Sequence, residues 1–232
     1  MNTTAYIDPT REKLLDAAIS HVVFDGWGPE TFRNAVADSG FSETLARVAA
    51  PRGSADLAAA YHKRGDREMI AALEAADLSE MRFRDRIAEA VWLRLMAVDR
   101  ELVRRGMALF SLPHYAPEGT RLVLETCDAI WTALGDTSRD VNWYTKRATL
   151  AGVCGSTVLY WLGDESEEFA DTRAFLDRRI DNVMQFEKVK AQVRENKALS
   201  PLLAVPNAIL GAIKAPAGVG RDDIPGTRSS DT

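Results

Sequence analysis

The chain has 232 residues, of which 46% are hydrophobic and 27% are charged, a composition typical of folded globular proteins. Its 29 basic and 34 acidic side chains give a formal net charge of −5, which argues against a protein that coats nucleic acid through bulk charge. The histidines and cysteines form none of the spacings that mark a metal site, and the sequence contains neither a phosphate-binding glycine loop nor a Gly-x-Ser-x-Gly motif. We therefore expect a protein that is not an enzyme and holds no metal or catalytic cofactor.

Two features bear on location. Cys127 and Cys154 are too few for a disulfide framework and suit a reducing compartment. No apolar run approaches the roughly 18 residues that span a bilayer, and the first residues lack the basic and apolar regions of a secretory signal. We expect a cytoplasmic protein that is peripherally associated with the inner (cytoplasmic) membrane.

Apolar residues recur at helical spacing almost throughout, and no period-2 run indicates a strand. The pattern predicts three short N-terminal helices, bounded by prolines, glycines and capping residues, over 11–24, 29–37 and 42–49. The next helix starts at Ser54 and is interrupted near Gly65. Longer helices follow over 78–105 (as one or two), 118–134, 140–162 and 166–197.

The expected organisation is a three-helix N-terminal region over 1–53, a helical bundle over 54–198, an amphipathic segment over 199–214 and a disordered tail over 215–232. Two short helices joined by a glycine-containing turn match a helix-turn-helix. The region resembles the DNA-binding domain of TetR-type regulators, whose second half is also an all-helical bundle for ligand binding and dimerisation. The expected fold is all-α and TetR-like, and the resemblance implies a homodimer.

The helix that would enter a DNA groove lacks the side chains for that role. Phosphates and base edges are contacted mainly by basic and polar donors, but residues 42–49 contain one arginine, Arg47, and carry Glu43 in the first turn. From Gly26 to Gly53 three arginines balance three acidic residues. The sequence predicts a retained scaffold that does not bind nucleic acid.

Three stretches of the second half are more specific. They are LPHYAPE from Leu112, DVNWYTKRA from Asp140 and FADTRAFLDRRI from Phe169. Together they resemble the Coq-nine family of ubiquinone biosynthesis proteins, over roughly residues 11–193. The resemblance implies a TetR-like protein without DNA binding. It would bind isoprenoid lipids, including ubiquinone intermediates, and present them to the diiron demethoxyubiquinone hydroxylase.

Trp143 lies about one helical turn from both Asp140 and Arg147. A tryptophan between a carboxylate and a guanidinium is either a surface anchor or an aromatic side chain covered by a salt bridge, and a half-buried core position is a further alternative. The resemblance implies a patch that docks the hydroxylase, and its aligned residues are Leu93, Ile130, Asp140, Trp143 and Tyr144. Leu93 and Ile130 are equally compatible with an ordinary core.

Small residues recur on the same helix, at Ala148, Ala151, Gly152, Gly155 and Ser156. Close helix packing would explain them, and so would a lipid-sized cavity. The predicted lipid-binding residues are Leu150, Val153, Val158, Trp161 and Leu162.

The segment 199–214 is the predicted membrane contact. Its aliphatic residues, too few to span a bilayer, are Leu202, Leu203, Val205, Ile209, Leu210 and Ile213. Between Met184 and Lys214 five basic residues outnumber two acidic ones, which favours an interfacial helix. Pro206 limits its length, and packing on the bundle or on a second copy is the alternative.

From these observations we expect a lipid-binding accessory protein of ubiquinone biosynthesis that acts at a membrane with the hydroxylase as its partner. The alternative is a TetR-type transcriptional regulator with a small apolar effector.

Overall fold

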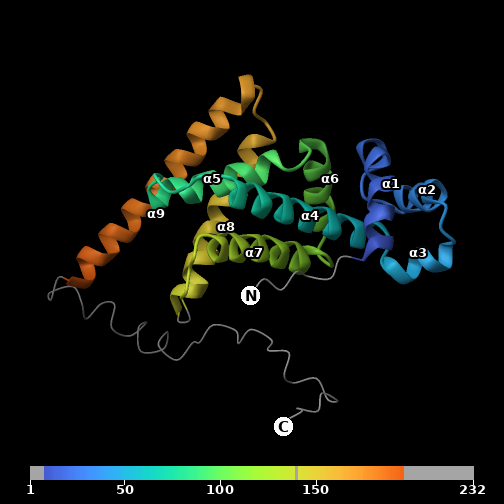
Figure 1. Ribbon diagram of the computed structural model, residues 1–232, viewed down its shortest axis with the longest axis horizontal. Helices are drawn as coiled ribbons and strands as arrows, with labels where there is room; N and C mark the ends of the chain where they lie inside the picture. Colours follow the sequence, from blue (N-terminus) through green and yellow to red (C-terminus); the bar gives the residue numbers. More distant parts are fainter. Residues whose placement is uncertain (1–7, 139–140, 196–232) are drawn as a thin grey trace, which may run out of the picture.

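The computed structural model describes residues 8–138 and 141–195, and all regular structure in these ranges is helical (Figure 1). The predicted all-α fold is confirmed. An N-terminal unit contains α1 (Pro9–Asp25), α2 (Pro29–Ser39) and α3 (Glu43–Ala49). The bundle contains α4 (Ser54–Ala75), α5 (Phe83–Met96), α6 (Arg100–Phe110), α7 (Ala116–Ala133), α8 (Val141–Trp161) and α9 (Ala170–Glu195). The segment predicted to contact a membrane and the predicted tail lie outside the described residues.

Capping residues set the ends of the N-terminal helices. The Asp8 carboxylate accepts a 2.9 Å hydrogen bond from the Thr10 amide at the start of α1, and Ser42 accepts from the Leu45 amide at the start of α3. Such side chains satisfy amides that have no partner within the helix. Leu14, Leu15, Ala18 and Val22 of α1 are buried, whereas Val23 is 40% exposed, because it lies just beyond the packed face.

The predicted interruption at Gly65 is wrong, since α4 runs unbroken from Ser54 to Ala75. Glycine serves close packing here: a Cβ at this position would lie 2.6 Å from Arg94 Nη1 and from Val98 Cγ1. The first turns of α4 pack in the N-terminal hydrophobic cluster, and Met69 and Leu73 pack in the cluster of the bundle. The helix therefore connects the two cores (Figure 1).

The region predicted as one or two helices over 78–105 forms two, α5 and α6. Asp99 separates them, because its carboxylate accepts from the amides of Glu101 and Leu102 and so caps α6. α6 stands between the N-terminal unit and the bundle (Figure 1). Leu102 is its one buried residue.

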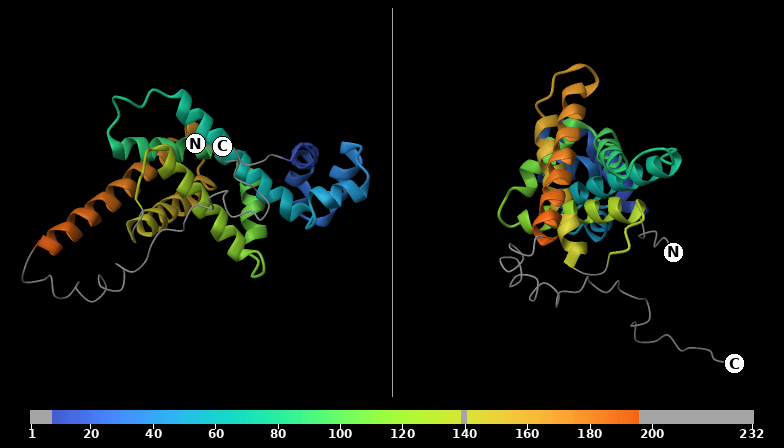
Figure 2. Two further views of the ribbon diagram at one scale, coloured as in Figure 1. Left: turned by 60° about the horizontal axis from the view of Figure 1, so that its bottom comes forward. Right: turned by 90° about the vertical axis from the view of Figure 1, so that its left-hand side faces the viewer.

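The helices α7, α8 and α9 complete the bundle, and α9 extends beyond it at the end opposite the N-terminal unit (Figure 2). Ion pairs of Arg84 with Asp181 and of Arg173 with Glu89 tie α9 to α5. A short 3-10 turn, Glu167–Phe169, precedes α9. Within the described residues, no helix combines the length and the apolar character needed to cross a membrane.

Candidate functional site

A cavity of about 510 Å³ lies where the N-terminal unit meets the bundle. Trp27 reaches it from the N-terminal unit, and α4 to α8 supply most of the remaining wall. The contribution of α6 is Leu102, Val103, Gly106, Met107 and Phe110. Its size and its largely aliphatic and aromatic wall are typical of sites for small apolar ligands, which occupy about 300–1,000 Å³.

The face of α8 that lines the cavity differs in part from the predicted one. Val158 and Trp161 are in the wall, whereas Leu150 and Val153 are buried in the cluster of the bundle and Leu162 is not among the lining residues. At about 100° per residue, positions 150 and 153 face away from 155 and 158.

Two of the small residues on α8, Ala151 and Gly155, line the cavity. A Cβ placed on Gly155 would meet no other atom within 4 Å, and the same holds for Gly152, which is exposed and outside the wall. Glycine at 155 therefore leaves space in the cavity that a larger side chain would fill.

One polar network interrupts the apolar wall, and it was not predicted from the sequence. Arg94 Nε donates to Asp66 Oδ1 over 2.6 Å, and the Thr126 hydroxyl donates to the same carboxylate oxygen over 2.9 Å. The ring of His62 lies 2.8 Å from the Thr126 oxygen. The spacing of His62 and Asp66, one turn apart on α4, was the available signal.

This network carries no net charge. Burial lowers the pKa of His62, although the nearby Asp66 carboxylate raises it, so the ring is neutral at pH 7. The Asp66 carboxylate is neutralised by Arg94, whose side chain is 12% exposed. Among the described residues, no three His, Cys, Asp or Glu side chains are grouped as a metal ion would require. The cavity therefore suits an uncharged, mainly apolar molecule.

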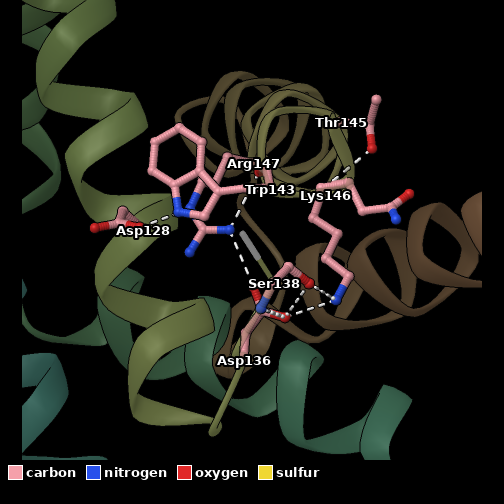
Figure 3. Close-up of polar contacts among 8 residues, drawn as sticks. Asp128, Asp136, Ser138, Trp143, Thr145, Lys146 and Arg147 are labelled. Atoms are coloured by element: carbon pink, nitrogen blue, oxygen red, sulfur yellow. Dashed lines mark hydrogen bonds and ion pairs between the residues drawn. The ribbon is translucent and has the colours of Figure 1, made fainter. Parts of the chain in front are cut away.

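A second site forms at the corner between α7 and α8, around Arg147 (Figure 3). The guanidinium is almost fully buried and donates to Asp128 Oδ1 over 2.6 Å and to Asp136 Oδ2 over 3.1 Å. Its carbon lies 4.2 Å from the centroid of the Trp143 ring. The arginine predicted to accompany Trp143 is thus beneath the ring, and its ion-pair partners come from α7 and the loop that follows it.

Asp136 holds this corner together. Its side chain is 4% exposed and accepts hydrogen bonds from Lys146 and Ser138 as well as from Arg147. Burial alone would raise the pKa of this carboxyl, but the hydrogen bonds from Lys146, Ser138 and Arg147 outweigh burial and hold the pKa well below its usual range. Asp136 is therefore ionised in the folded protein.

The predicted docking residues are only partly together. Trp143 and Tyr144 form an edge-to-face pair with ring centroids 4.8 Å apart, and Tyr144 is 38% exposed. Leu93 is half-buried, and Ile130 is fully buried, which corresponds to the core alternative for that residue. Asp140 lies outside the described residues.

The chain is similar in sequence to proteins of known family. Residues 116–187, which contain two of the three stretches quoted above, match the COQ9 family model. The mitochondrial ubiquinone biosynthesis protein COQ9 of Drosophila melanogaster is 30% identical over 194 residues, with 81% of this chain and 59% of that protein covered. Human mitochondrial COQ9 is 29% identical over 193 residues, with 79% and 60% covered. The chain is a COQ9 homologue.

This COQ9 homologue spans about three fifths of the length of the curated relatives it matches. Its fold is also that of a solved protein described as a TetR transcriptional regulator, from Nitrosomonas europaea. The TM-score is 0.62 at 23% identity, with 75% of this chain and 97% of that chain covered. The predicted TetR-like architecture is confirmed.

The helix of this COQ9 homologue that corresponds in order to a groove-reading helix is α3. Its outer surface is apolar at Val48 and Leu45, which are 73% and 43% exposed. Its arginine, Arg47, already has partners within the protein. The guanidinium carbon lies 4.6 Å from the centroid of the Phe32 ring, and Nε lies 3.9 Å from a Glu43 oxygen. Duplex DNA would thus meet aliphatic side chains and one engaged cation.

We expect this surface to bind duplex DNA no more tightly than acidic proteins of similar charge do, because it lacks the cations that release counterions from phosphates. A fluorescence-anisotropy titration with duplex DNA at low salt checks this expectation. Salt-dependent binding at submicromolar protein, lost in an Arg47→Ala variant, would contradict it.

Proposed function

We propose that this COQ9 homologue is a non-enzymatic, lipid-binding accessory protein of ubiquinone biosynthesis. It binds an isoprenoid quinone intermediate in the cavity and presents the intermediate to the diiron demethoxyubiquinone hydroxylase. The names of the curated relatives support the pathway. The observation that carries the binding role is the uncharged apolar cavity between α6 and α8.

The capacity of the cavity limits what it holds. Its volume of about 510 Å³ corresponds to about 17 water molecules at about 30 Å³ each. A substituted quinone ring with about one or two isoprene units would fill that space, whereas a long polyprenyl tail would not. The rest of the tail must then stay outside, which favours binding at a membrane surface over extraction into bulk water.

The proposed handover surface is the aromatic pair Trp143 and Tyr144, with Leu93 and Asp140 as further members. Aromatic side chains with partial exposure are typical anchors of protein interfaces. Ile130 would support the surface from the core. We retain the segment 199–214 as the proposed peripheral membrane contact at the inner membrane and a homodimer as the proposed assembly.

Substituting leucine for Gly155 tests the cavity directly. The new side chain enters open space, so the fold should remain intact while the ligand volume is filled. Binding of a ubiquinone with a short tail should weaken by about tenfold or more, because ligand and side chain compete for one volume. Quinones quench tryptophan, so fluorescence of Trp27 and Trp161 in the wall reports binding.

Gly152→Leu is the matched control. It adds the same side chain to the same helix at an exposed position where a Cβ also meets nothing within 4 Å. It should bind the quinone like the unmodified protein. Equal affinity of the two variants, both folded by circular dichroism, would contradict binding in this cavity.

A further inference from the structure

The helix α6 forms one wall of the cavity but buries little of its own surface. Five of its residues line the cavity, but only Leu102 is buried. The neighbouring helix α7 buries five residues, Leu122, Thr126, Cys127, Ile130 and Trp131. Since burial of apolar side chains is the main source of packing stability, α6 is the wall that can leave at low cost.

Arginines of α6 hold it in place through backbone carbonyls at the ends of other helices. Arg100 donates to the Asp164 carbonyl over 2.5 Å and Arg104 to the Leu162 carbonyl over 2.7 Å, both just beyond α8. Arg105 donates to the Val23 carbonyl over 3.0 Å, in the last turn of α1. Carbonyls at helix C-termini have no partner within the helix and attract cations.

The other end of α6 stays attached to α7. Gly119 allows this contact, because a Cβ there would lie 2.8 Å from Phe110 Cβ. The connection between the two helices is the short turn at Ser111 to Tyr115. Release of Arg104 and Arg105 would leave the first turn of α6 held by Arg100 and by the hydrogen bond from the Trp27 indole to the Leu102 carbonyl. It would loosen the middle of the helix while the C-terminal end remains fixed.

Acidic phospholipid headgroups are strong competitors for these arginines. A guanidinium binds a phosphate through charge-assisted, often bidentate hydrogen bonds that are about twice as strong as bonds to a neutral group. Arg104 and Arg105 are accessible, with side chains 50% and 40% exposed, and both form ion pairs with Glu101, so a phosphate must compete with this carboxylate as well as with the carbonyls. Beside them the last turn of α1 carries Val23 and Phe24, which are 40% and 83% exposed, before it ends at the exposed Asp25. Arginines next to exposed apolar side chains match an acidic bilayer surface.

We propose that α6 is a movable wall that controls access to the cavity. Contact with an acidic phospholipid surface displaces it by drawing Arg104 and Arg105 away from the Leu162 and Val23 carbonyls. The inference rests on the proposed function in one respect, that a membrane lipid enters the cavity. It adds where the lipid enters and why loading is confined to the membrane.

Hydrogen–deuterium exchange of the full chain tests whether acidic phospholipid displaces α6. Vesicles of phosphatidylglycerol should speed exchange of the amides in residues 100–110 by about tenfold or more, the effect expected when hydrogen bonds to charged groups are lost. Vesicles of phosphatidylcholine and inorganic phosphate at the same phosphate concentration should have much smaller effects. A short-tailed quinone carried in the vesicles should quench Trp27 and Trp161 faster from phosphatidylglycerol.

The double variant Arg104→Gln/Arg105→Gln distinguishes loss of the arginine–carbonyl hydrogen bonds from simple attraction to the membrane. Its α6 should exchange quickly without vesicles, and phosphatidylglycerol should add little. Arg33→Gln with Arg82→Gln removes the same charge from exposed positions outside α6 and should behave like the unmodified protein.

The proposed displacement of α6 would be wrong if its exchange is unchanged in phosphatidylglycerol, or if the double variant and its control exchange equally. Either result would hold even if the quinone still binds. If α6 opens as expected but no quinone quenches the two tryptophans, the proposed lipid-binding function fails instead.

Discussion

Replacing Asp136 with alanine is expected to lower the free energy of unfolding by about 3 kcal/mol, the lower end of the cost of breaking a buried ion pair, because Arg147 keeps only the half-exposed Asp128 as a partner. The charge left behind is Arg147, whose side chain is 4% exposed. Lys146 and Ser138 lose their acceptor as well. Denaturant titration of the purified protein measures the change.

Asp128 provides the matched control, since its carboxylate also contacts Arg147 but is 46% exposed. An exposed ion pair contributes about 0–1 kcal/mol, so Asp128→Ala should unfold near the midpoint of the unmodified protein. Equal destabilisation by the two alanines would show that burial of Asp136 does not decide its role.

Acid should remove the contribution of Asp136. The pKa of this carboxyl is lowered in the folded state, so its stabilisation is complete well above the unfolded value of about 3.9 and is lost as the pH falls through the lower folded value. The gap in melting temperature between the unmodified protein and Asp136→Ala should therefore be constant near neutral pH and narrow below about pH 4. A gap that widens in acid would contradict the assignment.

Replacing Trp143 with alanine is expected to weaken binding of the hydroxylase by about thirtyfold or more while the protein stays folded. A central aromatic anchor contributes about 2 kcal/mol or more to an interface, which is about thirtyfold in affinity. The ring is half-buried and lies over the Arg147 guanidinium. The expected loss of stability is therefore that of a cation–π contact, about 0.5–2 kcal/mol, and not the 3–5 kcal/mol of a core tryptophan.

The two tyrosines of α8 make the test specific. Tyr144 and Tyr160 are 38% and 39% exposed, and Tyr160 stacks on Phe175 at the other end of the helix. Tyr144→Ala should weaken binding of the hydroxylase, and Tyr160→Ala should not. Normal capture of the hydroxylase by a folded Trp143→Ala variant would remove this surface from the proposal.

Helix order and most helix ends follow from local sequence, because proline, glycine and capping residues act over a few positions. Asp8 and Ser42 are examples. Gly65 shows the limit: propensity marks it as a break, but its role depends on Arg94 of α5 and on Val98 in the turn after α5. Tertiary contacts override the local preference there.

The sites were predictable only in part for the same reason. Sequence patterns single out Trp143 and the small residues of α8, but not the face of α8 that is hollow. Periodicity gives relative directions on one helix, whereas the cavity depends on where α6 and Trp27 lie. The partners of Arg147 were likewise hidden, because Asp128 and Asp136 precede it by more than two turns and come from another helix and a loop.

The proposed function requires that the cavity holds an isoprenoid quinone intermediate. Mass spectrometry of the organic extract of the purified protein identifies the bound molecule, with Gly155→Leu prepared in parallel. We predict isoprenoid quinone precursors in the extract of the unmodified protein, at a content near one per chain, and their loss from the variant. An extract without isoprenoids, or the same lipid content in both proteins, would contradict the claim.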